Sequence, residues 1–218
     1  MAHSAKGKQF PPEPLNREET QALIRACRGT GPLAHRNRAL IALLWRSGLR
    51  IGEALSLRPS DVDEREGTVR VRAGKGKKDR VAVSDVEALG YLRAWREVRR
   101  RHGIDGRAPL FCTVADGTND PGVRQPGKPL YTAYARALLP KLAERAGIDK
   151  RVHAHGLRHS HATELVQAGV PLHVIAGQLG HASTATPDTY LAKLMPSERI
   201  KAMREAGWTL EPQEPGPA

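Results

Sequence analysis

The chain has 218 residues, with 35 lysines and arginines against 23 aspartates and glutamates, which gives a net charge of +12 and a pI near 10.2. A chain of this length can bury a core as one domain, and so positive a charge is typical of proteins that bind a polyanion, most often nucleic acid. The absence of a long apolar segment and of a signal peptide, together with a cysteine count of 2, argues against membrane and disulfide-stabilised secreted proteins and favours a cytoplasmic location.

The first part of the chain is predicted to form a polar tail followed by helices. Residues 1–14 end in a run of prolines that fits neither a helix nor a strand, so we expect a flexible N-terminal tail. Asn16 is a suitable N-cap for the helix that follows, and Glu19 occupies the matching capping-box position. Gly48 can take the left-handed conformation that ends a helix, which places Arg50 at a sharp junction. The helices predicted here cover residues 17–26, 35–47 and 51–57.

A β-hairpin is predicted next. Residues 67–72 alternate apolar and polar side chains, residues 74–78 read Gly-Lys-Gly-Lys-Lys, and the alternation resumes at residues 80–83. This pattern is typical of two antiparallel strands joined by a tip rich in glycine and lysine.

Helices are predicted over most of the remaining chain. Ser84 and Glu87 fit a capping box for the next helix, which reaches about residue 101, and Val86 is expected on its inward face. Residues 110–112 fit a short strand and residues 114–129 a loop. The later helices are predicted over residues 130–146, 157–168, 171–179, 187–193 and 197–206.

The expected fold is therefore α+β and mostly helical, with a small antiparallel sheet formed by the hairpin. We expect one domain over residues 15–208. Residues 209–218 are rich in proline and polar residues and are expected to form a disordered C-terminal tail.

Short segments with basic and phenolic side chains recur along this domain in a characteristic order. They are Gly48-Leu-Arg50-Ile-Gly-Glu53, then His155-Gly-Leu-Arg158-His159, then Leu179-Gly-His181 and, nine residues later, Tyr190. In order and spacing these segments resemble the active site of the tyrosine recombinases, the phage-integrase type of DNA strand-exchange enzyme. The resemblance runs from about residue 15 to residue 203, nearly the whole chain, and implies the catalytic domain of that family.

The resemblance also implies a role for each of these side chains. Arg50 and Arg158 would hold the nonbridging oxygens of a DNA phosphate, and His181 would donate a hydrogen bond to the same group. Tyr190 would be the nucleophile and His155 a proton carrier. In the hairpin, the pattern Gly-Lys-Gly-x-Lys-x-Arg-x-Val is similar to that of the family and identifies Lys75 as the general acid for the leaving 5′-oxygen.

The residue types suit this chemistry without a metal. Transfer of a phosphodiester needs charge stabilisation and a proton for the leaving oxygen. Many nucleases bind Mg²⁺ through clustered carboxylates, and no such cluster is evident in the sequence. Arginine can take the place of the metal, because its planar group hydrogen-bonds two phosphate oxygens and stays charged. We therefore expect no metal and no cofactor.

Other interpretations of single residues stay open. Glu53 lies three residues after Arg50, so it either orients Arg50 through an ion pair or is an ordinary exposed helix residue. Lys75 is either the general acid or part of a basic turn that contacts phosphate nonspecifically. For the isolated arginines a surface position or a salt bridge is the alternative, and for Tyr190 a place in the core.

The histidines of residues 153–161 also allow a zinc interpretation. His155 and His159 have the i, i+4 spacing of metal ligands on a helix. Against zinc, there is no nearby cysteine pair, and no glutamate follows the first histidine as in metalloprotease helices. His153, His159, His161 and His173 have no assigned role in the resemblance and are expected to be structural or to face DNA.

The predicted function is that of a site-specific recombinase or integrase that cuts and rejoins double-stranded DNA through a 3′-phosphotyrosyl intermediate, without metal or ATP. The expected assembly is a homotetramer on DNA with a dimer at each site, associated with the nucleoid when bound. Most family members carry a helical core-binding domain ahead of the catalytic domain, whereas here the catalytic motifs begin almost at once. We therefore allow for a partner recombinase or accessory DNA-binding protein. Three alternatives remain: a strand relaxer like the type IB topoisomerases, a DNA-binding accessory protein without catalysis, and a metal-dependent hydrolase.

Overall fold

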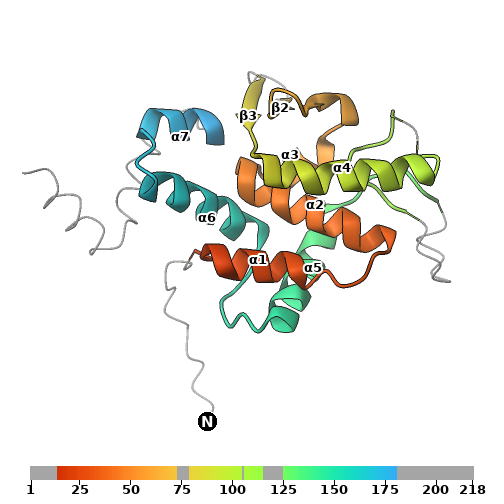
Figure 1. Ribbon diagram of the computed structural model, residues 1–218, viewed down its shortest axis with the longest axis horizontal. Helices are drawn as coiled ribbons and strands as arrows, with labels where there is room; N and C mark the ends of the chain where they lie inside the picture. Colours follow the sequence, from red (N-terminus) through yellow and green to blue (C-terminus); the bar gives the residue numbers. More distant parts are fainter. Residues whose placement is uncertain (1–13, 73–78, 105, 115–124, 181–218) are drawn as a thin grey trace, which may run out of the picture.

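The computed structural model describes residues 14–72, 79–104, 106–114 and 125–180, and their core is built around one central helix. This helix is α2 (Pro32–Ser47), with α4 (Val86–Arg101) packed along one side and α1 (Arg17–Arg25) on the other (Figure 1). Helix α6 (Ala154–Gln167) also packs against α2. The mostly helical α+β fold is thus confirmed.

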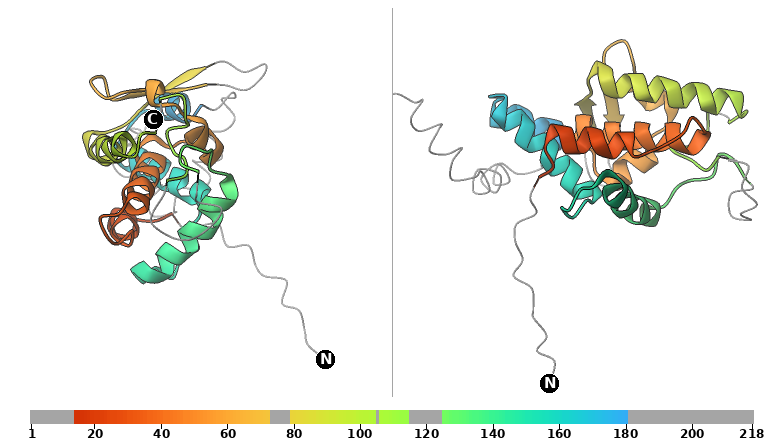
Figure 2. Two further views of the ribbon diagram at one scale, coloured as in Figure 1. Left: turned by 90° about the vertical axis from the view of Figure 1, so that its right-hand side faces the viewer. Right: turned by 60° about the horizontal axis from the view of Figure 1, so that its bottom comes forward.

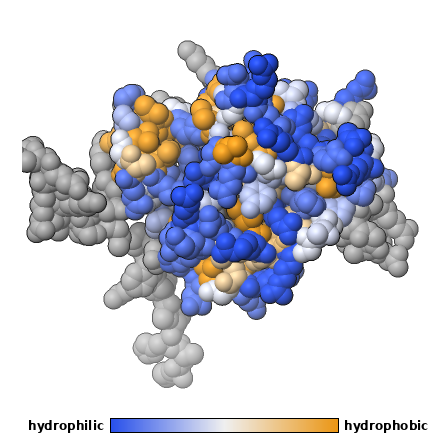
Figure 3. All heavy atoms as spheres, in the orientation of Figure 1, coloured by the Kyte–Doolittle hydropathy of each residue, from blue (hydrophilic) through white to orange (hydrophobic). Residues whose placement is uncertain are grey.

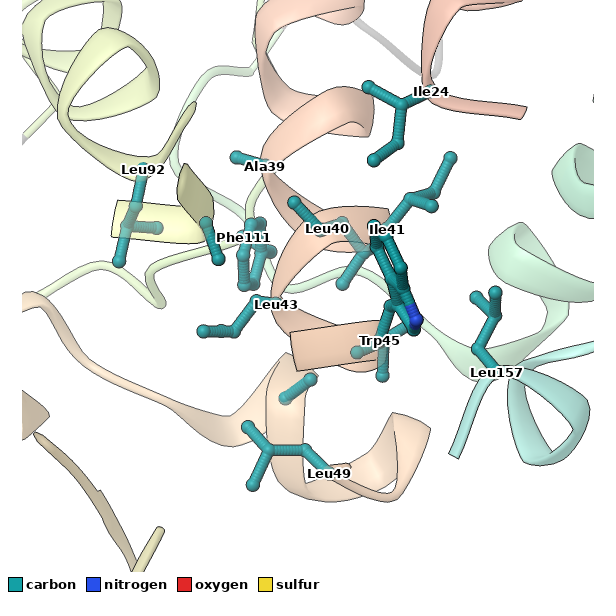
Figure 4. Packing of buried hydrophobic residues seen from close by; sticks show 14 of the residues in the cluster. Ile24, Ala39, Leu40, Ile41, Leu43, Trp45, Leu49, Leu92, Phe111 and Leu157 are labelled. Carbon is teal, nitrogen blue, oxygen red and sulfur yellow. The ribbon is translucent and has the colours of Figure 1, made fainter. Parts of the chain in front are cut away.

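Helix α2 is central because it is apolar on nearly all sides, as expected for a helix enclosed by others. Leu40, Ile41, Leu43, Leu44 and Trp45 are each at most 1% exposed. Figure 4 shows several of these side chains directed toward residues from the neighbouring helices. The helix ends at the predicted glycine, whose φ of 61° lies in the left-handed region. It begins at Pro32, three residues earlier than predicted, because proline is well suited to the first position of a helix.

The predicted capping box of α1 is confirmed. Asn16 Oδ1 accepts a hydrogen bond from the Glu19 N–H at 2.7 Å, and Glu19 Oε2 accepts one from the Asn16 N–H at 2.8 Å. Just before the cap, the Leu15 N–H donates to Ser160 Oγ of α6 at 2.9 Å. These bonds fix the start of α1 against the C-terminal part of the described chain.

The hairpin is confirmed and belongs to a three-stranded antiparallel sheet in the order β1-β2-β3. Its strands β2 (Thr68–Val71) and β3 (Arg80–Val83) pair with Val69 opposite Ala82, and both of these residues are fully buried. The first strand, β1 (Val62–Asp63), was not predicted. Two residues are too few to show the alternation by which a strand is recognised in a sequence.

The remaining helices surround the sheet and the central helix. They are α3 (Ile51–Ser56), the 3-10 helix η1 (Pro59–Asp61), α5 (Thr132–Ala146) and α7 (Leu172–Leu179). Helix α7 packs on α6 and on β3, whereas α5 lies at the end of the molecule opposite the sheet in the left view of Figure 2. Most of the face shown in Figure 3 is hydrophilic, and apolar side chains gather over α7.

Several local predictions are corrected. Asp85, not Ser84, caps α4: its Oδ1 accepts from the Ala88 N–H at 2.9 Å, so the helix starts one residue later than expected. Val86, expected on the inward face, is instead the first residue of α4 and is 77% exposed. Residues 110–112 form no strand, only an isolated bridge between Cys112 and Pro129. Helix α6 begins three residues early, because the His153 side chain serves as its N-cap.

Some predictions fall outside the described residues. These are the tip of the hairpin, the tails at residues 1–13 and 209–218, most of the loop at residues 114–129, and the helices at residues 187–193 and 197–206. The domain limits of 15 and 208 stay a prediction. Among the described helices, none combines the length and the apolar character that a membrane span requires.

Candidate active site

Arg158 joins motif segments that lie far apart in the sequence. It is 1% exposed, and its guanidinium donates from Nη1 to the Gly48 carbonyl and from Nη2 to the Leu179 carbonyl, each at 2.7 Å. Both carbonyls stand at the C-terminal ends of helices, α2 and α7, where carbonyls lack helical partners and the helix dipole favours a cation. One buried side chain from α6 therefore brings three of the predicted motif segments together.

Arg50 lies at the junction between α2 and α3, as predicted, and its side chain is half exposed (51%). Of the two interpretations left open for Glu53, the ion pair is the one present, with Arg50 Nη1 at 3.0 Å from Glu53 Oε1. Glu53 Oε2 also accepts a hydrogen bond from the Arg50 N–H at 2.8 Å and so caps α3. Glu53 thus holds both the main chain and the side chain of Arg50.

Glu53 has a second partner that the sequence did not reveal. Arg80, the first residue of β3, donates from Nη1 to Oε1 and from Nη2 to Oε2 of Glu53, each at 2.9 Å. Burial opposes ionisation of Glu53, but the hydrogen bonds from Arg80 and Arg50 outweigh it and lower the pKa of the carboxyl to about 2. Glu53 is therefore ionised throughout the physiological range.

Arg80 and Gln178 attach α7 to the sheet. A Cβ at Gly180 would lie 2.4 Å from Arg80 Cδ, so only glycine allows the arginine to lie this close to the end of α7. Two residues earlier, the Gln178 side chain accepts from the Val83 N–H at 2.9 Å and donates to the Val83 carbonyl at 2.7 Å. Its amide also donates to the Ser47 carbonyl at 3.3 Å, which ties α7 to the end of α2.

His155 lies at the start of α6, three residues before Arg158, and is exposed. Its ring stacks on that of His153, with 6.4 Å between centroids and 6° between planes. His153 Nδ1 accepts from the Gly156 N–H at 2.9 Å, which assigns His153 a structural role as the N-cap of α6. Burial, together with the charge of Arg151, lowers the pKa of His153, which favours the neutral ring that can accept this hydrogen bond.

His161 is a buried member of the same helix. It is 5% exposed and packs so closely on Gly48 that a Cβ there would lie 2.6 Å from its Cδ2. Burial, helped by the charges of Arg46 and Arg158, lowers the pKa of His161 to about 4. The sequence allowed His161 to be structural or to face DNA. Its ring is enclosed and cannot face DNA, so His161 is structural.

The structure does not describe the remaining predicted site residues. Lys75, His181 and Tyr190 lie outside the described residues, so their roles stay predictions. In the described part of the chain, His, Cys, Asp and Glu side chains form no group of three or more able to hold a metal ion, and this includes the neighbourhood of His155 and His159.

The chain is similar to known proteins over most of its length. Residues 13–196 match the phage integrase family. The chain is 35% identical over 192 residues to the tyrosine recombinase XerC of Halalkalibacterium halodurans, with 87% of this chain and 61% of that protein covered. It is 38% identical over 184 residues to the tyrosine recombinase XerD of Mycobacterium leprae, with 82% and 56% covered. The chain thus spans about three fifths of the length of these curated relatives.

Solved structures share the fold. The crystal structure of XerA recombinase superimposes with a TM-score of 0.75 at 28% identity, covering 93% of this chain and 68% of that one. The XerH site-specific recombinase bound to its palindromic difH substrate in a post-cleavage complex gives a TM-score of 0.69 at 27% identity, with 88% and 52% covered. With the motif segments joined through Arg158 and a family match over most of its residues, the chain belongs to the phage integrase family.

Proposed function

We propose that this chain is the catalytic domain of a site-specific DNA recombinase that cuts and rejoins double-stranded DNA through a 3′-phosphotyrosyl intermediate, without metal or ATP. The observation that carries the proposal is the pair of Arg158 bonds to Gly48 and Leu179, because they join segments that the resemblance assigns to one active site. Similarity to recombinases, including one bound to its DNA substrate, supports the same function.

The phosphate is held by arginines in this proposal. Arg50 is half exposed and fixed at its base by Glu53, so its planar group can hydrogen-bond two nonbridging oxygens. Arg158 lies buried beside it with its guanidinium fixed by two carbonyls, and supplies positive charge that needs no reorganisation during the reaction. His181 donates a further hydrogen bond to the phosphate.

The reaction is a transesterification. The Tyr190 oxygen attacks phosphorus and loses its proton, which His155 carries away. The bond between phosphorus and the 5′-oxygen breaks, and Lys75 donates a proton to that oxygen, which leaves as a 5′-hydroxyl. A 5′-hydroxyl of a second DNA strand then attacks the phosphotyrosine and reverses the step. The ester bond conserves the bond energy, so ATP is not required.

The larger assembly follows from the same proposal. Residues 15–208 would form the catalytic domain, and a homotetramer would hold two DNA sites, with a dimer at each. A partner recombinase or an accessory DNA-binding protein would contribute to site selection. In the cell the protein would be cytoplasmic and associated with the nucleoid when bound to DNA.

Covalent trapping from a randomised DNA pool tests the proposal and identifies the target sequence in the same experiment. The protein is incubated in excess EDTA with nicked duplexes that carry a randomised segment. Duplexes that remain bound after denaturation with detergent are then sequenced. We expect a covalent complex on a recurring sequence, and none with Tyr190→Phe, which keeps the ring but lacks the attacking oxygen.

Other outcomes would change the proposal. Trapping that is lost in EDTA and restored by Mg²⁺ or Zn²⁺ would contradict the metal-free mechanism. Relaxation of supercoiled plasmid without sequence preference would point to a type IB topoisomerase activity. DNA binding with no covalent complex at all would point to an accessory protein.

The role of Lys75 is tested separately. Lys75→Ala should slow cleavage by about 10²- to 10⁴-fold, because the leaving oxygen is no longer protonated. A 5′-bridging phosphorothiolate expels sulfur, which needs no proton, so this substrate should restore cleavage by Lys75→Ala but not by Tyr190→Phe. Failure to restore it would leave Lys75 as a nonspecific phosphate contact.

A further inference from the structure

The Glu53 carboxylate lies between two guanidinium groups of different exposure. Arg80 binds it through two hydrogen bonds of 2.9 Å and has a side chain that is 17% exposed. Arg50 binds it through Nη1 at 3.0 Å and through its main-chain N–H at 2.8 Å, and has a side chain that is 51% exposed. We call Arg50, Glu53 and Arg80 the charge triad. Within it, only the Arg50 side chain is exposed to any large extent.

The charges of the triad determine the net charge that a DNA phosphate would encounter at this site. The pKa of Glu53 is about 2, so the carboxylate is negative, and two guanidinium charges minus one carboxylate charge leave a net charge of +1. Without Arg80, Glu53 and Arg50 would form a neutral pair. A neutral pair attracts a phosphate less than a cation does, because the carboxylate repels the same oxygens that the guanidinium attracts.

The position of Arg80 links the triad to the rest of the site. It opens β3, five residues after Lys75, and so belongs to the hairpin whose tip carries that lysine. Its side chain also packs on Gly180 at the end of α7, the helix whose last carbonyl binds Arg158. Figure 1 shows β3 beside α7.

We propose that Arg80 is a positioning residue that acts through Glu53. By pairing with both carboxylate oxygens it balances the charge of Glu53 and fixes its orientation, so that Arg50 is presented to DNA as an uncompensated cation. The inference rests on the proposed function and adds to it a residue that does not touch the phosphate.

A double-mutant cycle on the rate of covalent complex formation tests the inference, with the duplex recovered by trapping as substrate. Arg80→Gln should slow the reaction by roughly 10- to 100-fold, the loss typical when the outer partner of a functional group is removed. Adding Glu53→Gln removes the carboxylate charge and returns the site to a net charge of +1. The double variant should therefore react faster than Arg80→Gln alone, and an equal or greater loss would show that Arg80 acts independently of Glu53.

Arg100→Gln is the matched control. Arg100 binds Glu97 through two hydrogen bonds of 2.8 and 2.7 Å, but the pair lies on the exposed surface of α4. The same charge is removed away from the motif segments, and the reaction rate should not change. A loss equal to that of Arg80→Gln would assign the effect to overall charge and overturn the proposal.

The salt dependence of DNA affinity gives a second readout that does not require cleavage. Arg80→Gln should reduce the slope of log affinity against log salt by about 1, and adding Glu53→Gln should restore it. If the unaltered chain forms no covalent complex, the proposed function fails. The salt-dependence slope alone then tests whether Arg80 balances the charge of Glu53. If the chain cleaves and Arg80→Gln cleaves equally fast, the inference fails and the proposed function stands.

Arg80→Lys covers the case in which Arg80→Gln does not fold, which thermal melting would show. Lysine keeps the charge but not the two-point bond, so the loss should be smaller than with glutamine. That loss should disappear in the Glu53→Gln background. Its persistence there would overturn the proposal.

Discussion

Among the described residues, buried arginines occur in two regions, and in both regions they donate to main-chain carbonyls. Near residues 108–112, Arg36 and Arg99 are 2% and 3% exposed and donate to main-chain carbonyls, including Cys112 O at 2.9 Å and Leu110 O at 2.9 Å. Near α3 and α7, Arg158 is 1% exposed and also donates to two carbonyls. Burial and carbonyl bonding therefore do not distinguish a site arginine from a structural one.

The difference lies in what surrounds each arginine. Arg36 lies over the ring of Tyr134, 4.6 Å from its centroid, and Arg99 donates to a main-chain carbonyl of the segment that follows α4. Both arginines therefore provide hydrogen-bond donors for carbonyls that no helix or strand satisfies. Arg158 instead connects the ends of two helices next to the half-exposed Arg50 and its carboxylate. A cluster in which one guanidinium remains accessible can bind an anion, whereas a cluster closed by carbonyls and a ring serves only the fold.

Among the arginines of the two regions, we expect substitution of Arg50 to have the greatest effect on cleavage. Arg50→Ala should slow covalent complex formation by about 10²- to 10³-fold, because it removes charge stabilisation of the transition state. The melting temperature should change little, since the side chain is half exposed. The two quantities are measured on the same preparation. A large drop in melting temperature with normal cleavage would place Arg50 among the structural arginines.

Arg36→Met should do the opposite of Arg50→Ala: it should lower stability and leave cleavage unchanged. It keeps much of the side-chain volume but removes the bonds to Cys112 O and Tyr134, which leaves buried polar groups without partners. We expect the free energy of unfolding to fall by about 2–4 kcal/mol. Urea denaturation measures this loss, and the cleavage rate per folded molecule should stay the same. Slower cleavage by folded protein would show that the two arginine regions are coupled.

His161 makes stability depend on pH, because it is buried and the charges of Arg46 and Arg158 act on its ring. Its pKa is lowered to about 4, so the unfolded chain binds more protons than the folded chain between pH 6.5 and pH 4. The stabilising contribution of the neutral ring is therefore complete above pH 6.5 and is lost as the pH falls toward 4, by about 1–3 kcal/mol. His161→Leu should be less sensitive over this window in urea denaturation, and an unchanged pH profile would contradict the assignment.

The smallest effect concerns an arginine–carboxylate pair outside the motifs. Asp85 caps α4 and also pairs with Arg46. Asp85→Ala should lower the free energy of unfolding by about 1–2 kcal/mol, the usual cost of a lost cap and its ion pair. Ser84→Ala should have almost no effect, since the Ser84 hydroxyl has no hydrogen-bond partner. Neither variant should alter the cleavage rate. A larger loss of unfolding free energy with Ser84→Ala than with Asp85→Ala would show that Ser84 is the N-cap of α4.

Sequence reasoning succeeded where neighbouring residues determine the structure. The Asn16 capping box and the left-handed Gly48 depend on residues within a few positions of one another, and the hairpin on two strands that follow each other in the chain. It failed where two local solutions compete, as between Ser84 and Asp85, because both residue types are good caps. The bond from Arg80 to Glu53 was missed for another reason: it spans 27 positions and exists only once the chain has folded to bring β3 to Glu53.

The bond between Gln178 and Val83 has a consequence for self-association. Strand β3 ends the sheet, and an edge strand with unpaired N–H and carbonyl groups is a template for strands of other molecules. At Val83 both groups are already occupied, because the Gln178 amide pairs with them as a neighbouring peptide would. One side chain from a helix thus acts as a cap on the sheet, and a foreign strand would have to displace it before it could extend past Val83.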